Sequence, residues 1–408
     1  PLPLSFLVLS FLFYLLLPSM SYQKIVPNHA PPTADLPTSK SWKQKAGAGF
    51  FFASAAVLTV ALFSGGNSSA AAAALPFETK SGDICSSPSY SKTTLKLSHS
   101  QSFAALFDDN KGEKKWEASD VTVSGGKFWS IADNSWSLLS IDEQLPINSG
   151  KNKQIGEPRR NGKEDSGFEG LIARSDPTEF YIMRESIDVN GSGDFHALLL
   201  DVKIVDGEED YQVSRTCVSE VEFEGDSKGF EGAAAVTGSD GQEYIFGLCE
   251  GNNCREGKAG KERGNGKVVA MLISHEEMHG YDCVLKTHKI LDLPKTAYFM
   301  DYSAIAIDDS GKVAVTSQED SKVWIGELAM DEATGLYDPE TSNFVSTEGE
   351  VLDFPRDTNC EVIFCNIEGI HFINSELLVA VSDKMKSKGK QNFQCLEYDQ
   401  SIHVFVRP

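Results

Sequence analysis

The chain has 408 residues, of which 41% are hydrophobic, so it can bury a sizeable core. Its formal net charge of -22 gives an acidic surface that repels a polyanionic backbone, which argues against nucleic acid as a partner. The same acidity leaves acid-rich sites for divalent cations open.

Two apolar stretches lie near the amino terminus, at residues 2–17 and 46–65. The second stretch is uncharged and long enough to cross a bilayer. Lys40, Lys43 and Lys45 precede it, and a basic flank tends to stay cytoplasmic, so the chain after this stretch should lie outside. The pattern predicts a single-pass type II membrane anchor.

The expected organisation is a targeting or cytoplasmic segment at 1–45, a transmembrane helix at 46–66, a linker at 67–84 and a lumenal or extracellular domain at 85–408. Two alternatives stay open. A cleaved second stretch would give a secreted product, and the first stretch could be a truncated signal sequence or an extension ahead of a start at Met20.

The cysteines fit an exported domain. All 8 lie after the expected span, and an even number suits an oxidising compartment. Cys249 with Cys254, and Cys360 with Cys365, are the expected local disulfides. A zinc site is the alternative, but neither pair has C-x2-C spacing and no histidine lies close in the sequence. Asn190 lies in a glycosylation sequon, NGS.

A short motif recurs along the exported region. Its clear copies are GFEGLIA from Gly167, GFEGAAA from Gly229 and NIEGIHF from Asn366, and degenerate copies start at Ala118 and Tyr302. Two further strand-like runs follow each copy, and no long helical period appears. The sequence therefore predicts an all-β fold, a β-propeller in which five repeats can be read and six blades are possible. A β-sandwich with coincidental motifs is the alternative.

The last repeat ends without an outer strand. TTLKLS, residues 93–98, could supply that strand from the other end of the chain. Such a pairing would close the ring.

The Glu-Gly-aliphatic entry to the inner strand, with a following strand that ends near Ser-Glu, resembles the phytase-like and SdiA-regulated propeller proteins over residues 115–408. This resemblance implies a secreted or membrane-attached propeller, generally of six blades, and in some relatives Ca²⁺-dependent phosphoester or ester hydrolysis. The five repeats depart from six, and no catalytic signature carries over residue by residue.

The repeated acids should gather at one end of the central channel, because inner strands start there and second strands return there. Glu169, Glu231 and Glu368 are the candidate catalytic residues. The candidate metal ligands are Glu169, Glu231, Glu368, Asp301, Glu185 and Glu250. Ca²⁺ is the first candidate cofactor, because it accepts six to eight oxygens in irregular geometry.

Further acids and a serine belong to the same two rings of residues. These are Ser119 and Asp120, which join Asp301 and the three repeat glutamates at the channel mouth, and Asp133, Glu319 and Asp383 at the ends of second strands. In the alternative interpretation, the inner-strand side chains simply hydrogen-bond the backbone of neighbouring blades and hold the ring together.

Three basic runs, at 151–163, 255–267 and 384–390, should rise on the same face as the glutamates. The candidate substrate-binding residues are Lys258, Lys261, Arg263 and Lys386. Cations beside an acidic metal site suit an anionic ligand such as a phosphate ester. Ordinary solvated loops are the alternative.

HEEMHG, from His275, fits the H-E-x-x-H zinc pattern. Its flanks are strand-like rather than helical, which favours a turn between the third and fourth strands of the third repeat. A zinc metalloprotease stays a minor alternative. The main hypothesis is an exported propeller that hydrolyses a phosphate or carboxylic ester with Ca²⁺, and its rival is a non-enzymatic domain that binds a protein or anionic small molecule.

Overall fold

The structure is a computed structural model that describes residues 85, 92–107, 115–158, 165–205, 207, 209–225, 228–386, 391 and 393–408. The expected cytoplasmic segment, transmembrane helix and linker lie outside the described residues. Within the described part, no helix is long and apolar enough to cross a membrane.

Twenty strands form five blades, and each blade is an antiparallel arrangement of four strands. The first blade holds β2 (Ala118–Ser124), β3 (Lys127–Ala132), β4 (Ser135–Asp142) and β5 (Lys153–Ile155). The second holds β6 (Phe168–Ala173), β7 (Glu179–Asp188), β8 (Phe195–Ile204) and β9 (Tyr211–Phe223). The third holds β10 (Phe230–Thr237), β11 (Glu243–Cys249), β12 (Lys267–Ser274) and β13 (Cys283–Asp292).

The fourth blade holds β14 (Ala304–Ile307), β15 (Lys312–Ser317), β16 (Lys322–Glu327) and β17 (Glu350–Asp353). The fifth holds β18 (Ile367–Phe372), β19 (Leu377–Ser382), β20 (Ser401–Val406) and β1 (Lys96–Ser102). The helices are short: α1 (Phe103–Leu106), α2 (Gly257–Gly260), η4 (Val189–Gly191), η5 (Asn252–Cys254) and η6 (Phe393–Glu397). The second and third blades share one eight-stranded sheet because β9 and β13 pair in parallel.

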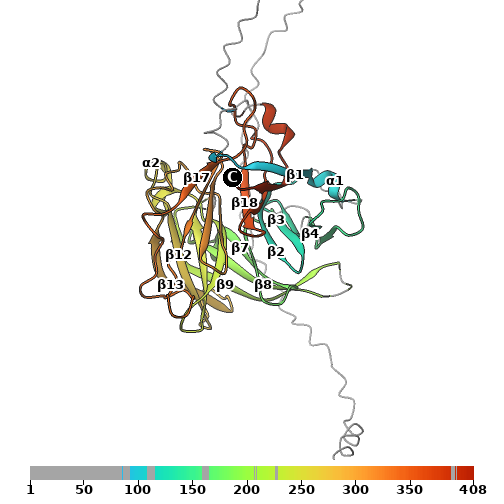
Figure 1. Cartoon of the computed structure of the whole chain (residues 1–408). Coiled ribbons are helices and arrows are strands. Elements are labelled where there is room, and N and C mark those ends of the chain that lie inside the picture. Colours follow the sequence, from blue (N-terminus) through green and yellow to red (C-terminus); the bar gives the residue numbers. More distant parts are fainter. Residues whose placement is uncertain are drawn as a thin grey trace, which may run out of the picture. The chain divides into compact units, whose positions relative to one another are not determined.

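The inner strands close into a ring. Each of β2, β6, β10 and β14 contacts the next inner strand, and β18 contacts both β14 and β2. The sheets accordingly follow one another around the molecule in chain order (Figure 1). The described residues form a five-bladed β-propeller. The all-β prediction is confirmed, the five repeats are the five blades, and no sixth blade occurs among these residues.

The ring closes through the amino-terminal strand, as expected. β1 pairs with β20 from Lys96 to Ser102, a few residues later than the predicted strand. The residues just before β1 bind the fourth blade instead, because Leu95 N donates to the Asp353 carbonyl and Asp353 N to the Thr93 carbonyl. One segment therefore ties the fourth and fifth blades together.

The Glu-Gly pair has a structural explanation. In all three clear copies the register shifts at the glutamate, so Glu169, Glu231 and Glu368 each occupy a β-bulge. A bulge leaves one residue unpaired and redirects its side chain. The glycine that follows lies against the next blade: a Cβ on Gly170 would meet Ala233 Cβ at 2.7 Å, and one on Gly369 would meet Asp120 Cα at 2.6 Å.

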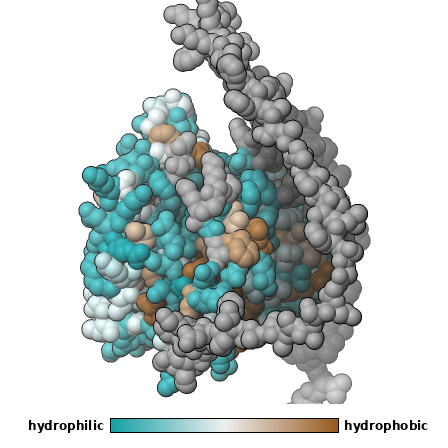
Figure 2. Space-filling view, turned by 90° about the horizontal axis from the view of Figure 1, so that it is seen from above, coloured by the Kyte–Doolittle hydropathy of each residue, from teal (hydrophilic) through white to brown (hydrophobic). Residues whose placement is uncertain are grey.

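Apolar side chains fill the space between neighbouring sheets. Phe246 of the third blade and Trp324 of the fourth, for example, belong to one buried cluster. The face seen in Figure 2 is mostly hydrophilic, in keeping with the acidic composition. Burying the apolar faces of adjacent blades is what stabilises the ring.

Four disulfides join all the cysteines: Cys85–Cys360, Cys217–Cys283, Cys249–Cys254 and Cys365–Cys395. The expected Cys249–Cys254 pair is confirmed, and the expected Cys360–Cys365 pair is wrong. Closure of the ring explains the error in part, because Cys85 precedes the closing strand and reaches Cys360 from the other end of the chain. Cys365 instead pairs within the fifth blade, with Cys395 in the loop between β19 and β20.

His403 makes the closure sensitive to pH. It is fully buried on β20, where Ser100 of β1 contacts Nδ1 at 2.9 Å and Ser382 of β19 contacts Nε2 at 3.1 Å. Burial lowers the pKa of His403 to about 3. The unfolded chain takes up a proton at this side chain below about pH 6.5, whereas the folded chain does not.

We expect His403→Gln to be less stable than the wild type at pH 7, with a gap that narrows as the pH falls. The gap should shrink by about 1.4 kcal/mol per pH unit below about pH 6, because only the wild type loses this contribution in acid. Urea unfolding of both proteins between pH 7 and pH 4.5 measures the gap. A gap independent of pH would contradict the assignment.

Candidate metal centre at the channel mouth

Some inner-strand side chains do serve the ring. Ser119 Oγ donates to the Phe168 carbonyl of the next blade, and Ser303 Oγ donates to the Ile367 carbonyl at 3.0 Å. The buried Asp120 carboxylate accepts from Leu171 N of the next blade at 2.7 Å. For these residues the structural alternative holds: they link neighbouring blades and are not open to a ligand.

The glutamates at the equivalent positions behave differently. Glu169 is only 7% exposed, and no described residue donates a hydrogen bond to its carboxylate. Burial raises the pKa of Glu169 well above its usual range, and the charges of Glu231, Glu185, Asp133 and Glu368 raise it further. Carboxyl groups from four blades therefore lie close enough to repel one another near the ring of inner strands.

Three carboxylates meet most closely at the second and third blades. Glu185, Glu231 and Glu250 each place an oxygen within 4.8 Å of the others. Burial, then the charges of Glu250 and Glu185, raise the pKa of Glu231 well above its usual range. Lys228 Nζ forms an ion pair with Glu250 and is the cation beside this cluster. We call Glu185, Glu231 and Glu250 the carboxylate cluster.

Acids of the first and fifth blades extend the negative region. Burial, reinforced by Glu117 and Asp383, raises the pKa of Asp133 to about 8, and burial raises that of Asp383 to about 7. Oδ1 of Asp133 and Oδ1 of Asp383 are buried, and neither has a hydrogen-bond partner in the described part of the chain. Burial and the Asp383 charge likewise raise the pKa of Glu368.

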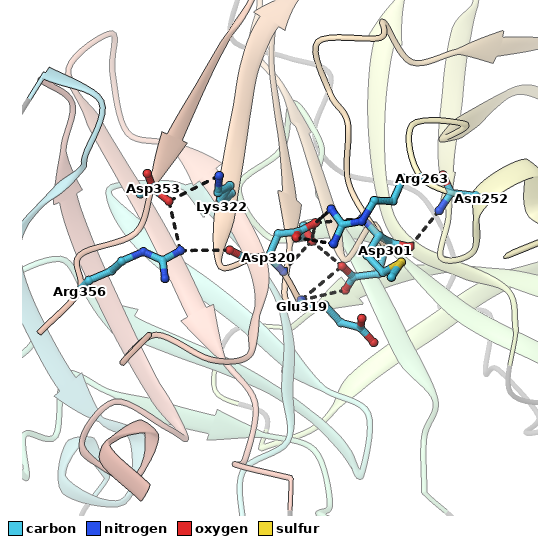
Figure 3. A network of polar contacts seen from close by, with 10 residues as sticks. Asn252, Arg263, Asp301, Glu319, Asp320, Lys322, Asp353 and Arg356 are labelled. Atoms are coloured by element: carbon cyan, nitrogen blue, oxygen red, sulfur yellow. Dashed lines mark hydrogen bonds and ion pairs between the residues drawn. The ribbon is translucent and has the colours of Figure 1, made fainter. Parts of the chain in front are cut away.

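The fourth blade is different, because the carboxylates of Asp301 and Asp320 already accept hydrogen bonds from protein donors. Asp301 accepts from Ser317 Oγ and from Glu319 N at 3.2 Å, and its nearest acids are Glu319 and Asp320. Burial raises the pKa of Asp301 to about 6. Arg263 donates two hydrogen bonds to Asp320, at 3.0 and 3.1 Å (Figure 3). Asp301, an expected metal ligand, therefore belongs to a separate network.

The expected substrate-binding cations are placed unequally. Lys386 lies near the glutamates, since its charge opposes the raised pKa of Glu368, and its Nζ donates to Gln318 Oε1 at 2.9 Å. Lys258 and Lys261 are exposed at α2, and Arg263 is held by Asp320. Sequence analysis missed Lys228. Its position could have indicated it, because it directly precedes the repeat motif that begins at Gly229 and leads into the third inner strand.

HEEMHG forms no helix. His275 and His279 lie in the exposed connection between β12 and β13, as the turn interpretation predicted. The zinc metalloprotease alternative is wrong, because that site needs both histidines one turn apart on a helix.

The donors at the channel mouth suit a hard cation. The carboxylate cluster offers only oxygen ligands, all from half-buried side chains, and carries more negative charge than Lys228 can offset. Oxygen ligands favour Ca²⁺, Mg²⁺ or Mn²⁺ over the ions that select imidazole or thiolate. The residues therefore fit a divalent cation.

No known family model matches the chain, and no curated protein sequence matches it. Solved structures show weak likenesses. The glutaminyl cyclase of Myxococcus xanthus is 13% identical, with a TM-score of 0.38 over 77% of this chain and 97% of that one. An aldose sugar dehydrogenase of Streptomyces coelicolor is 10% identical, with a TM-score of 0.39 over 77% and 99%.

An α-L-arabinofuranosidase of Lactobacillus brevis is 13% identical, with a TM-score of 0.41 over 74% of this chain and 92% of that one. Likenesses at this level carry no argument about activity. The propeller assignment rests on the closed ring of inner strands described above.

Proposed function

We propose that the channel mouth binds Ca²⁺ and hydrolyses a phosphate or carboxylic ester of an anionic substrate. The observation that supports this most is the approach of Glu185, Glu231 and Glu250 to within 4.8 Å. Three like charges at that separation destabilise one another unless they are protonated or neutralised by a cation. Bound Ca²⁺ would polarise the ester oxygen and lower the pKa of a water molecule.

Glu169 is the proposed general base. Its carboxylate has no donor among the described residues, and burial together with its acidic neighbours raises its pKa, which makes the ionised carboxylate a stronger base. In the proposed step the water oxygen bonds to phosphorus or the acyl carbon while the bond to the leaving oxygen breaks. The water proton moves to Glu169 Oε and then to the leaving oxygen, so protons balance. Lys386 and Lys228 would attract the anionic substrate.

The test is hydrolysis of p-nitrophenyl phosphate and p-nitrophenyl acetate by the full chain, purified in detergent, stripped with chelator and then returned to Ca²⁺. We expect Ca²⁺ to restore hydrolysis. Glu169→Gln should lower kcat by roughly 100-fold or more, the range for loss of a general base. The matched control is Glu319→Gln, because Glu319 also ends a second strand but lies in the fourth-blade network.

Absence of both Ca²⁺-dependent hydrolysis and calorimetric binding of any divalent ion would overturn the proposal. Ion binding without hydrolysis would instead favour the rival function, a binding domain that uses the same face. The membrane anchor and the phytase-like resemblance stay part of the proposal, in which the carboxylate cluster faces the extracytoplasmic side.

A further inference from the structure

Two histidines from different blades meet in the outer part of the propeller. His196 lies on β8 of the second blade, and His279 lies in the hairpin between β12 and β13 of the third. Their ring centroids are 5.2 Å apart. This pair is built from β8 and an outer hairpin and not from the inner-strand bulges that carry the repeat glutamates.

A hydrogen bond selects one tautomer of the neutral His196 ring. His196 is only 6% exposed, and its Nδ1 lies 2.9 Å from the Ser219 carbonyl oxygen. A carbonyl can only accept, so Nδ1 carries the proton and Nε2 of the neutral ring keeps its lone pair. No described residue forms a hydrogen bond with Nε2. A buried imidazole whose other nitrogen donates to a carbonyl is the arrangement common to metal-binding histidines.

The second histidine is held above the first by a tight turn. Tyr281 N donates to the Met278 carbonyl at 2.9 Å, and the two central residues, His279 and Gly280, have φ of 53° and 83°. Such a turn favours Asn or Gly at its first central position, because other residues are strained there. Histidine is one of the few other residues found with positive φ, and the exposed ring of His279 contacts the buried ring of His196.

We propose that His196 and His279 form a second metal site, which takes a transition-metal ion that prefers imidazole, Cu²⁺ more tightly than Zn²⁺. Two nitrogens on one zinc ion lie at most about 4 Å apart, twice the bond length, and the centroid separation allows this. Imidazole suits copper and zinc, and copper binds the more strongly of the two. The only cluster of three candidate ligands among the described residues is the carboxylate cluster, so water would complete this site.

The experiment titrates the metal-free full chain with CuSO₄ and follows binding by calorimetry and the copper EPR spectrum. We expect one Cu²⁺ bound with nitrogen hyperfine structure. His279→Asn keeps a residue that tolerates positive φ, so it should unfold at the wild-type temperature yet bind Cu²⁺ at least about 10-fold more weakly. His275→Ala, in the same exposed loop, is the control and should bind as the wild type does.

Equal Cu²⁺ affinity in the wild type and His279→Asn would overturn the site, and so would an equal loss in His275→Ala. His196→Gln gives a second measurement on the other ligand. Zn²⁺ should displace Cu²⁺ only in excess, and Ca²⁺ should not displace it. Glu231→Gln should leave Cu²⁺ binding unchanged, which separates this site from the proposed channel function.

Discussion

Glu231→Gln should weaken Ca²⁺ binding by roughly 100-fold or more, because it removes a central ligand charge from the carboxylate cluster. The same change should stabilise the metal-free protein. The pKa of Glu231 is raised by burial and by its acidic neighbours, so the folded chain carries repulsion that the neutral amide lacks. Calorimetry of Ca²⁺ binding and thermal unfolding in chelator measure the two effects.

The gain in stability of the metal-free Glu231→Gln protein should depend on pH. A carboxyl group whose pKa is raised on folding stabilises the protein below its unfolded value of about 4.5, and that stability is lost as the pH rises. Glu231→Gln should therefore show its largest gain over the wild type at neutral and alkaline pH and little gain near pH 4.

Glu319→Gln is the control for this prediction too, since Glu319 is exposed and lies outside the cluster. If Glu231→Gln bound Ca²⁺ as tightly as the wild type, the cluster would not be the cation site. A loss of stability in chelator would show that the glutamate holds the fold together, as Asp120 does.

Gly369→Ala should destabilise the propeller by about 1–3 kcal/mol, the usual cost of overpacking a well-packed core. The clash cannot be relieved by a side-chain rotation, because the added methyl group would meet backbone atoms. The added methyl group would lie 2.6 Å from Asp120 Cα and 2.8 Å from its carbonyl carbon. Asp120 belongs to the first blade and Gly369 to the fifth, so the substitution acts on the junction where the ring closes.

Gly150→Ala is the matched control. A Cβ at Gly150 would meet no atom within 4 Å, and its backbone is not in the left-handed region. Its free energy of unfolding in urea should equal that of the wild type within about 0.5 kcal/mol. Equal stability of Gly369→Ala and Gly150→Ala would refute the view that the glycine of the repeat exists for contact between blades.

Local patterns in the sequence were sufficient for the architecture. Strand-length apolar runs and the recurring motif predicted an all-β propeller with five readable repeats and left a sixth blade open, because alternation and repetition are properties of neighbouring residues. The same repetition placed Glu169, Glu231 and Glu368 at equivalent positions, which the ring then brings to one channel. The closing strand could also be predicted, because the last repeat lacks an outer strand that the amino-terminal end of the domain could supply.

Contacts between distant residues were not predictable in this way. Asp120 stands next to a repeat position and was expected near the glutamates, yet its carboxylate accepts a hydrogen bond from Leu171 N of the next blade, whereas Glu169 has no donor in the described structure. Arg263 was expected to meet a substrate and is held by Asp320 instead. In each case the partner is more than 40 residues away, and only the packing of blades selects it.

The amino-acid sequence by itself determined the strands, their fivefold repetition, the acidity of the domain and the pairing of Cys249 with Cys254. The tertiary structure alone decided that Cys365 joins Cys395, that Lys228 neutralises Glu250 and that His196 meets His279. The physical reason is that backbone patterns act over a few residues, whereas ion pairs, disulfides and ligand sites depend on which blades the closed ring makes neighbours.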